Sequence, residues 1–251
     1  MGKMIYSIIK ASEEPTQITE VLSGLRGISG ANLEFVQCAD IIAVTCSAER
    51  KEVVADRSNT LDYAGVIDEL SKTCTLLPVR FGSVMESEDD ILKMLERNYQ
   101  GIQNNLDKVE GKVEFGLKVF CDTEKLKSRP EIFGEENIKI FDKPPGRQNN
   151  SVYLDYVNKK LIEYRIEEAL LLFVNSVIKE ITDCCISVGA NGKFRKMVNQ
   201  NNIIDALFLV ERSKTNGLIG VVKELQVKYP DLDFILTGPW PPYNFVDITI
   251  S

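Results

Sequence analysis

The sequence predicts an α+β fold of two domains, and the order of its periodic segments supports this class. Over residues 1–122 the order is strand, helix, strand, strand, helix, helix, strand. Over residues 151–251 it is helix, strand, strand, helix, strand, a variant of the same plan. We therefore expect a ferredoxin-like N-terminal domain, with an antiparallel sheet and helices on one face, and a C-terminal α+β domain of similar plan.

The first domain is built from alternating apolar runs and helical spacings. Ala39-Asp40 joins two β-rich runs and indicates a hairpin, while Ser87 opens a helix whose first turn carries the acids Glu88 and Asp89. Residues 113–121 alternate strictly between apolar and other side chains, as a half-buried strand does. The expected strands are 4–10, 32–38, 41–46 and 113–121, with a short extended piece at 75–79 before the turn, and the expected helices are 18–25, 61–70 and 87–109.

The second half begins after a segment without periodicity. Residues 123–150 contain scattered Pro and Gly and are expected to be a connector. A long helix is expected from residue 151 to about residue 182, with its second half buried because apolar residues occupy several faces. We expect strands at 184–188, 203–210 and 232–236, a polar loop at 189–202, a helix at 216–228, and a Pro- and aromatic-rich tail at 237–245.

Composition excludes several classes of function. The net charge of −7 argues against nucleic acid and against binding anionic membranes by charge. The chain has no histidine, so Ser/His and Cys/His catalytic pairs and His-based zinc sites are excluded. Its six cysteines form no C-x-x-C pair, which favours reduced thiols in a cytosolic protein. The longest apolar run, at about ten residues, is half a membrane span, so no membrane association is expected.

No segment carries a convincing catalytic motif. The glycines at 24, 27 and 30 follow a helix, whereas a dinucleotide loop follows a strand. The carboxylates at 86, 88, 89 and 90 are conceivable magnesium ligands, but acids commonly cluster at a helix N-terminus. We therefore expect no enzyme, no catalytic residues, no metal and no cofactor.

Two short segments concentrate Pro, Gly and aromatic residues, a composition that favours docking over chemistry. One is Leu77–Gly82 and the other is Thr237–Phe245, which holds the single Trp. The alternative is structural: an arginine that ties two elements together, a phenylalanine in the core and a tail clamped on the protein. As candidate protein-interaction residues we name Arg80, Phe81, Trp240, Pro241, Tyr243 and Phe245.

These segments resemble the gas vesicle protein GvpF/GvpL family. The resemblance rests on LPVRFGSV at 77–84, VEFGLKV at 113–119 and LTGPWPPYNF at 236–245, and it covers nearly the whole chain. It implies a non-enzymatic two-domain α+β protein that binds the hydrophobic major shell protein GvpA and other gas vesicle accessory proteins. It also implies a location in gas vesicles, and in the cytoplasm before assembly.

The chain departs from the pattern expected of the family at one point. Family members are expected often to carry a histidine in the helix before the Leu-Pro-x-Arg-Phe-Gly segment, where this chain has Asp62-Tyr63-Ala64. Any role of that histidine is therefore absent here. From the residues alone, the alternative function is a small-molecule-sensing regulatory protein of ferredoxin-like fold, because such domains also bind metabolites.

Overall fold

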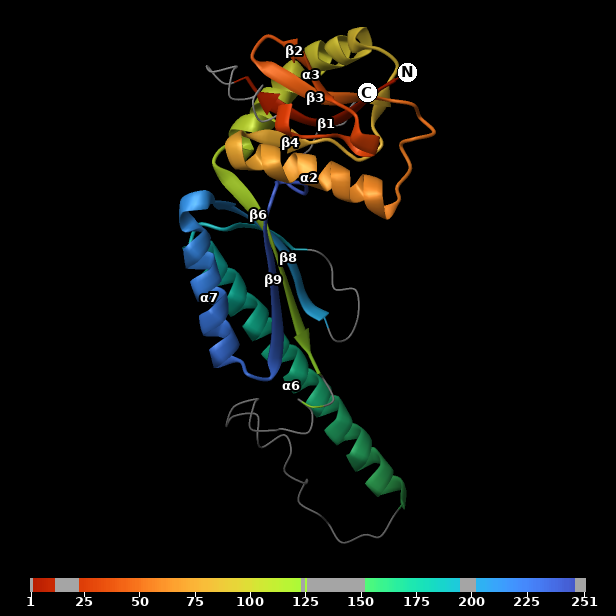
Figure 1. Cartoon of the computed structure of the whole chain (residues 1–251). Helices are drawn as coiled ribbons and strands as arrows, with labels where there is room; N and C mark the ends of the chain where they lie inside the picture. The colour runs from red at the N-terminus through yellow and green to blue at the C-terminus, as the bar shows by residue number, and fades with distance from the viewer. Residues whose placement is uncertain (1, 12–22, 123–124, 126–151, 195–201, 247–251) are drawn as a thin grey trace. The chain divides into compact units, whose positions relative to one another are not determined.

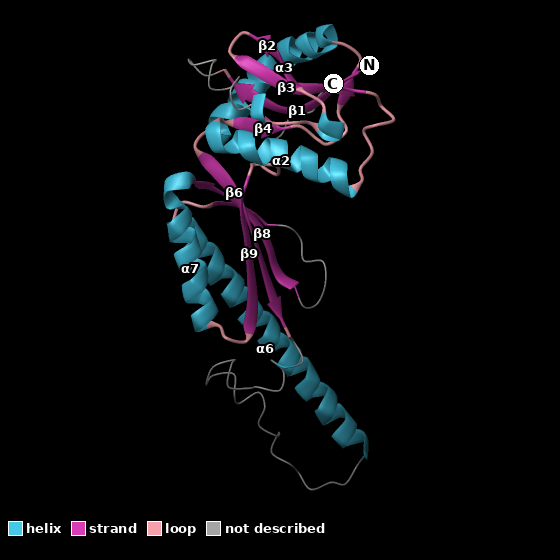
Figure 2. Cartoon of the chain, in the orientation of Figure 1, coloured by secondary structure: helices cyan, strands magenta, loops and turns pink. Residues whose placement is uncertain are grey.

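The computed structural model describes residues 2–11, 23–122, 125, 152–194 and 202–246. Figure 1 shows the course of the chain and Figure 2 its helices and strands. The helix expected at 18–25 and the connector expected at 123–150 lie almost entirely outside the described residues. The strands are β1 (Gly2–Lys10), β2 (Leu33–Cys38), β3 (Ile41–Ala48), β4 (Leu76–Pro78), β5 (Val84–Met85), β6 (Lys112–Cys121), β7 (Asn191–Phe194), β8 (Asn202–Glu211) and β9 (Leu232–Trp240). The helices are α2 (Arg57–Thr73), α3 (Glu88–Val109), α6 (Val152–Ser187) and α7 (Thr215–Lys228), with short 3-10 turns η1 (Ile28–Gly30) and η3 (Arg212–Lys214).

The first sheet has the strand order β2-β3-β1-β4, and β5 also pairs with β1. All of its pairings are antiparallel. The hairpin expected at Ala39-Asp40 joins β2 to β3, and Ala39 adopts a positive φ of 51° there. The α+β class with antiparallel sheets is therefore confirmed.

The core of this sheet lies between β1, β3 and α2. Met4 and Tyr6 of β1 pack in one buried cluster with Tyr63, Ile67 and Leu70 of α2. Helix α3 covers the opposite face of the sheet (Figure 1), so the described helices of this unit lie on both faces and not, as expected, on one. Because both faces are covered, the central strands β1 and β3 are buried along nearly their whole length rather than on alternate residues.

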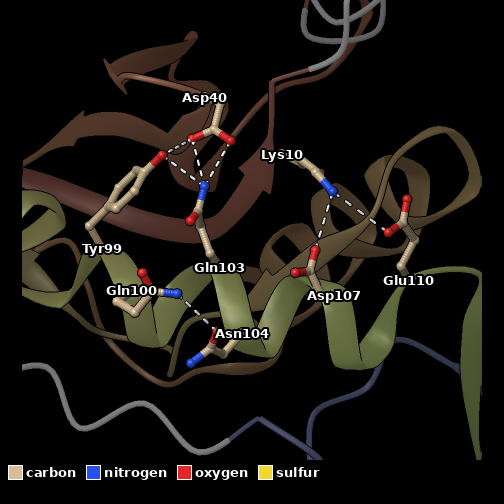
Figure 3. A network of polar contacts seen from close by, with 8 residues as sticks. All are labelled: Lys10, Asp40, Tyr99, Gln100, Gln103, Asn104, Asp107 and Glu110. Atoms are coloured by element: carbon tan, nitrogen blue, oxygen red, sulfur yellow. Dashed lines mark hydrogen bonds and ion pairs between the residues drawn. The ribbon is translucent and has the colours of Figure 1, made fainter.

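Helix α3 is attached to the sheet by a network of polar contacts (Figure 3). Asp40, in the β2–β3 turn, accepts hydrogen bonds from the Tyr99 hydroxyl and from Gln103 Nε2 at 2.8 and 3.1 Å. Lys10 Nζ, at the end of β1, forms ion pairs with Asp107 at 3.2 Å and with Glu110 at 3.6 Å. The Tyr99 hydrogen bond, as the largest cause, lowers the pKa of Asp40, so its carboxylate is charged at neutral pH.

The second sheet has the order β7-β8-β6-β9. We expected the strand at 113–121 to complete the first sheet, and this prediction was wrong. The strand is β6, which is the first strand of the second sheet in chain order. The short β4 takes the fourth place in the first sheet instead. Strand pattern alone does not identify the pairing partner, which explains the error. If the four strands of each sheet are numbered along the chain, their spatial order in both sheets is 2-3-1-4. This order is the ferredoxin-like arrangement.

Helix α6 is longer than the sequence indicated. It continues to Ser187, so the strand expected at 184–188 is its last turn, and β7 lies within the loop expected at 189–202. The buried residues at this end of α6 are Val177, Ile181 and Cys185, and their spacing of four is helical. The apolar run at 184–188 is too short to show this spacing by itself, so it resembled a strand. Helices α6 and α7 are joined where Glu180 accepts a hydrogen bond from the Tyr229 hydroxyl at 2.6 Å and pairs with Lys228.

The chain forms two compact units whose ranges differ from the domains expected at 1–122 and 151–251. The first unit contains Met1–Glu114, Leu209–Arg212 and Gly238–Ser251, and the second contains Phe115–Phe208 and Ser213–Thr237. From Gly238 onward, the Pro- and aromatic-rich tail expected in the C-terminal domain therefore belongs to the first unit, although β9 of the second sheet continues to Trp240. The segments Leu77–Gly82 and Gly238–Phe245 thus lie in this one unit.

Candidate functional site

A tight turn directly after β4 forms one side of the candidate site. The Val79 amide donates to the Tyr6 carbonyl at 2.9 Å, which continues the pairing with β1. The chain then reverses: the Ser83 amide and hydroxyl both donate to the Arg80 carbonyl, at 3.2 and 2.7 Å. The Ser83 carbonyl in turn accepts from the Ile5 amide at 2.9 Å. The turn is thus held to β1 at both ends, and the Arg80 side chain is exposed.

Gly82 gives this turn its conformation. Its φ is +85°, a region that L-residues avoid, and a Cβ there would meet only Val53 Cγ1 at 4.0 Å. We expect Gly82→Ala to lower the free energy of unfolding by about 1 kcal/mol, through backbone strain and not through crowding. Urea unfolding measures this change.

The matched control is Gly101→Ala, in the exposed middle of α3, where a Cβ has open space and no positive φ is recorded. This change should stabilise the protein by roughly 0.5–1 kcal/mol because alanine is the better helix former. Equal effects of the two substitutions would contradict the role assigned to Gly82.

Three aromatic rings pack together next to the turn. Tyr6 and Tyr63 are stacked with ring centroids 5.6 Å apart, and Phe81 meets Tyr63 edge-on at 5.3 Å. The Tyr63 hydroxyl donates to the Val79 carbonyl, and the Tyr6 hydroxyl accepts from the Ile28 amide at 2.8 Å. Burial raises the pKa of both phenols, so they remain neutral at physiological pH and act as structural hydrogen-bonding groups.

The C-terminal segment of the first unit is fixed mainly by a buried carboxylate. Glu114 is only 3% exposed, and it accepts hydrogen bonds from the Asn244 amide at 2.8 Å and from Asn244 Nδ2 at 2.5 Å. Lys108 Nζ donates to the Phe245 carbonyl at 2.8 Å. Pro241 and Phe245 are buried. These contacts hold the segment on the unit and orient Tyr243.

The turn and the C-terminal segment meet at a pocket of about 690 Å³. Apolar and aromatic side chains form most of its lining, with the Arg80 side chain as the cation. This mixture of apolar walls and few polar groups is typical of binding sites. Its lining residues are Ile8, Tyr63, Leu77, Pro78, Val79, Arg80, Phe81, Ser83, Tyr243 and Val246.

Arg80 and Tyr243 are the polar groups that a partner could reach. No carboxylate within the described part of the chain pairs with the Arg80 guanidinium, so it can accept a carboxylate ligand in bidentate geometry. Tyr243 is 41% exposed. Partial burial, followed by the charges of Asp68 and Glu114, raises its pKa to about 12, which keeps the hydroxyl protonated as a hydrogen-bond donor.

The structure brings together three of the six residues named from the sequence. Arg80, Phe81 and Tyr243 line the pocket, whereas Trp240 is half-exposed outside its lining. Pro241 and Phe245 are buried, as the clamped-tail alternative describes. Sequence reasoning missed Glu114 and Tyr63, because an acid in an alternating strand and a tyrosine in a helix give no signal of their contacts.

Within the described residues, no group of three or more Cys, Asp or Glu side chains could hold a metal ion. Burial raises the pKa of the Cys74 and Cys121 thiols to about 11 and of Cys185 to about 12, which leaves them protonated and weakly nucleophilic. No helix in the described ranges is long and apolar enough to cross a membrane.

Comparisons with known proteins agree with the sequence resemblance. Gas vesicle protein F of Streptomyces sp. (strain CB03234) is 24% identical over 98% of this chain and 100% of its own length. Gas vesicle protein L of the same organism is 22% identical, over 90% of this chain and 87% of its length. Gas vesicle protein F1 of Halobacterium salinarum is 23% identical over the same shares.

Two solved structures have the same fold. The crystal structure of GvpF from Anabaena sp. PCC7120 matches with a TM-score of 0.79 at 19% identity, covering 99% of both chains. That of GvpF from Microcystis aeruginosa matches with a TM-score of 0.72 at 16% identity, covering 98% of this chain and 99% of its own. The family model described as gas vesicle synthesis protein GvpL/GvpF matches residues 2–247. With that match over almost the whole sequence, the chain belongs to the GvpL/GvpF family of gas vesicle synthesis proteins.

Proposed function

We propose that this protein binds the small hydrophobic shell protein of gas vesicles, GvpA, and keeps it from aggregating before the vesicle wall nucleates. Family membership supports a role connected with gas vesicles. The observation that carries the more specific role is the pocket between the Arg80 turn and Tyr243. In this role the protein acts by binding and not by catalysis, in the cytoplasm first and at the vesicle later.

The chemistry of the pocket supports a protein ligand with an apolar side chain and a neighbouring carboxylate. The apolar side chain would fill the space over Tyr63 and Phe81, and the carboxylate would pair with Arg80. Tyr243 is held by the segment that Glu114 anchors, so its ring is ordered before binding and little entropy is lost. Arg and Tyr are also the residue types that dominate interface energies.

The charge of the protein supports the protective part of the role. A shell subunit must expose apolar surface to polymerise, and such surface aggregates when it is free. A partner with a net charge of −7 that covers this surface keeps the complex dispersed by mutual repulsion. Release then requires only that shell–shell contacts replace those in the pocket.

The test is a pull-down of purified full-length protein on immobilised GvpA, followed by affinity measurement. We expect Arg80→Ala and Tyr243→Ala each to weaken binding roughly tenfold, the loss of about 1.4 kcal/mol from an interface contact. Trp240→Ala, outside the pocket lining, tests whether the docking surface extends beyond it. Thermal stability should remain nearly unchanged in all three variants because each side chain is at least partly exposed.

Matched controls are Arg97→Ala and Tyr156→Ala, two exposed residues of the same types on α3 and α6. These variants should bind like the wild type. Unchanged affinity in both pocket variants would sink the docking role of the pocket. A large loss of stability in Tyr243→Ala would instead identify that residue as part of the structural clamp.

The second candidate function is that of a regulatory protein that senses a small molecule. The pocket volume of about 690 Å³ supports this candidate because it lies in the range of small-molecule sites. A metabolite screen that includes small carboxylates distinguishes the two. Ligand-dependent melting that Arg80→Ala abolishes, together with no binding of GvpA, would replace the assembly role by the sensing role.

A further inference from the structure

A second pocket lies in the first unit, where helices α2 and α3 end at Thr73 and Val109. All of its lining residues belong to this unit. Its volume is about 170 Å³. That is room for roughly five water molecules at about 30 Å³ each, so the second pocket fits a small ion and not a drug-sized ligand.

In the described part of the chain, the lining of the second pocket contains three cations and no carboxylate. The cations are Lys72, Lys112 and Arg212. This lining contrasts with the whole chain, in which acids outnumber lysines and arginines by 37 to 30. Lys72 is matched by ion pairs with Asp68 at 3.3 Å and Glu69 at 2.6 Å. The charges that remain to the pocket are therefore those of Lys112 and Arg212.

These two cations also bind the ends of the helices. Lys112 Nζ donates to the Lys108 carbonyl in the last turn of α3, at 2.7 Å. Arg212 Nη2 donates to the Ser71 carbonyl in the last turn of α2, at 2.5 Å. Each helix C-terminus carries about half a negative charge, so the two ends together offset about one of the two positive charges. No carboxylate in the pocket lining offsets the rest.

The donors that line the second pocket are of the types that hold phosphate groups in proteins. The Lys112 ammonium has three donors and forms no ion pair within the described residues. Arg212 supplies a planar guanidinium. The hydroxyl of Thr75 has no hydrogen-bond partner among the described residues, so it can donate to a ligand. A point charge, a planar fork and a hydroxyl thus line one small cavity.

We propose that the second pocket binds a phosphate group. Lys112 and Arg212 contact the phosphate oxygens, and the Thr75 hydroxyl donates a further hydrogen bond. The volume admits the phosphate alone, so the remainder of any larger ligand lies in solvent. Pro241 and Pro242 also line the pocket, so a bound phosphate fixes the start of the C-terminal segment against the ends of α2 and α3.

The test is a titration of the full-length protein with inorganic phosphate at constant ionic strength, because salt screens exposed charges. One readout is the fluorescence of Trp240, the single tryptophan, which directly precedes the lining residue Pro241. The other is thermal unfolding. We expect a saturable change in fluorescence with a dissociation constant of about 1 mM. The melting temperature should rise by about 3 °C at a tenfold excess over that constant.

Three variants identify the pocket as the place of binding. Lys112→Gln should weaken phosphate binding at least about tenfold, because it removes a charged donor. Thr75→Val keeps the shape of the side chain and removes the hydroxyl, so it should weaken binding about fivefold. The matched control is Lys118→Gln, an exposed lysine on the same strand as Lys112 and outside the pocket lining, which should bind like the wild type.

Acetate and AMP distinguish the possible ligands in the same titration. AMP that binds at least about tenfold tighter than inorganic phosphate would assign the site to the phosphate of a nucleotide, and equal affinities would assign it to inorganic phosphate. Acetate that binds as well as phosphate would overturn the proposal. So would a wild type without a saturable response, or a Lys112→Gln variant that binds phosphate like the wild type. None of these measurements uses GvpA, so they leave the proposed function to its own test.

Discussion

Glu114→Ala is expected to lower the free energy of unfolding by about 3 kcal/mol, because it removes a buried acceptor and leaves its donors unpaired. Glu114 accepts from both the main-chain amide and the side-chain amide of Asn244. Neither donor can easily form a replacement hydrogen bond with water, because the site of the Glu114 side chain is buried and Asn244 is only partly accessible to solvent. Urea unfolding of the full-length protein measures the loss. GvpA affinity should fall as well if the Asn244 segment positions Tyr243.

Glu96→Ala is the matched control, since this exposed glutamate on α3 should change stability by less than about 0.5 kcal/mol. A double-mutant cycle with Asn244→Ala isolates the contact between the two side chains. The cost of Glu114→Ala should fall by roughly half in the Asn244→Ala background, because that background lacks the side-chain amide donor and keeps the main-chain amide. Additive effects of the two changes would show that the contact between the two side chains does not contribute to stability.

The second large effect is expected for Tyr63→Ala, with a loss of about 4 kcal/mol in the free energy of unfolding. The ring of Tyr63 is 6% exposed and packs between Tyr6 and Phe81, so its removal leaves a cavity beneath the pocket. The hydroxyl contributes separately through its hydrogen bond to the Val79 carbonyl. Tyr63→Phe should therefore cost only about 1 kcal/mol, the usual value of one such bond.

The comparison variant for Tyr63→Ala is Tyr156→Ala, in which a tyrosine that is 60% exposed on α6 is truncated in the same way. Its unfolding free energy should stay within about 0.5 kcal/mol of the wild type. If Tyr63→Phe were as damaging as Tyr63→Ala, the main contribution of Tyr63 would be its hydrogen bond, and the expectation that aromatic packing dominates would be wrong.

The sequence predicted local structure where local interactions determine it. The hairpin at Ala39-Asp40 formed as expected, and Ser87 is the N-cap of α3, with its hydroxyl accepting from the Asp90 amide at 3.2 Å. These features depend on residues within a few positions of one another, so they can be predicted from the local sequence. The end of α6 was misjudged because Cys184-Cys185-Ile186 is apolar in a way that fits a strand or a helix turn.

The candidate site was predicted in its parts but not in its assembly. Pro, Gly and aromatic content singled out both segments, yet nothing in the chain indicated that Arg80 and Tyr243 line one pocket. That proximity follows from the return of residues 238–246 to the first unit, a contact across most of the sequence. Glu114 reads as a solvent-facing acid of an alternating strand. Glu114 is buried where it contacts Asn244, and this contact cannot be predicted from the sequence around either residue.

The return of the C-terminal segment also has a consequence for synthesis on the ribosome. Residues 2–114 emerge early, but the amide groups of Asn244 that pair with Glu114 emerge only after the whole second unit has been made. The first unit therefore cannot reach its final packing while the chain is still growing, and the second unit has the opportunity to fold before it. An N-terminal fragment that stops at residue 122 would keep Glu114 without these partners. The pocket beside Arg80 would thus be completed last, which prevents a nascent chain from binding through a finished site.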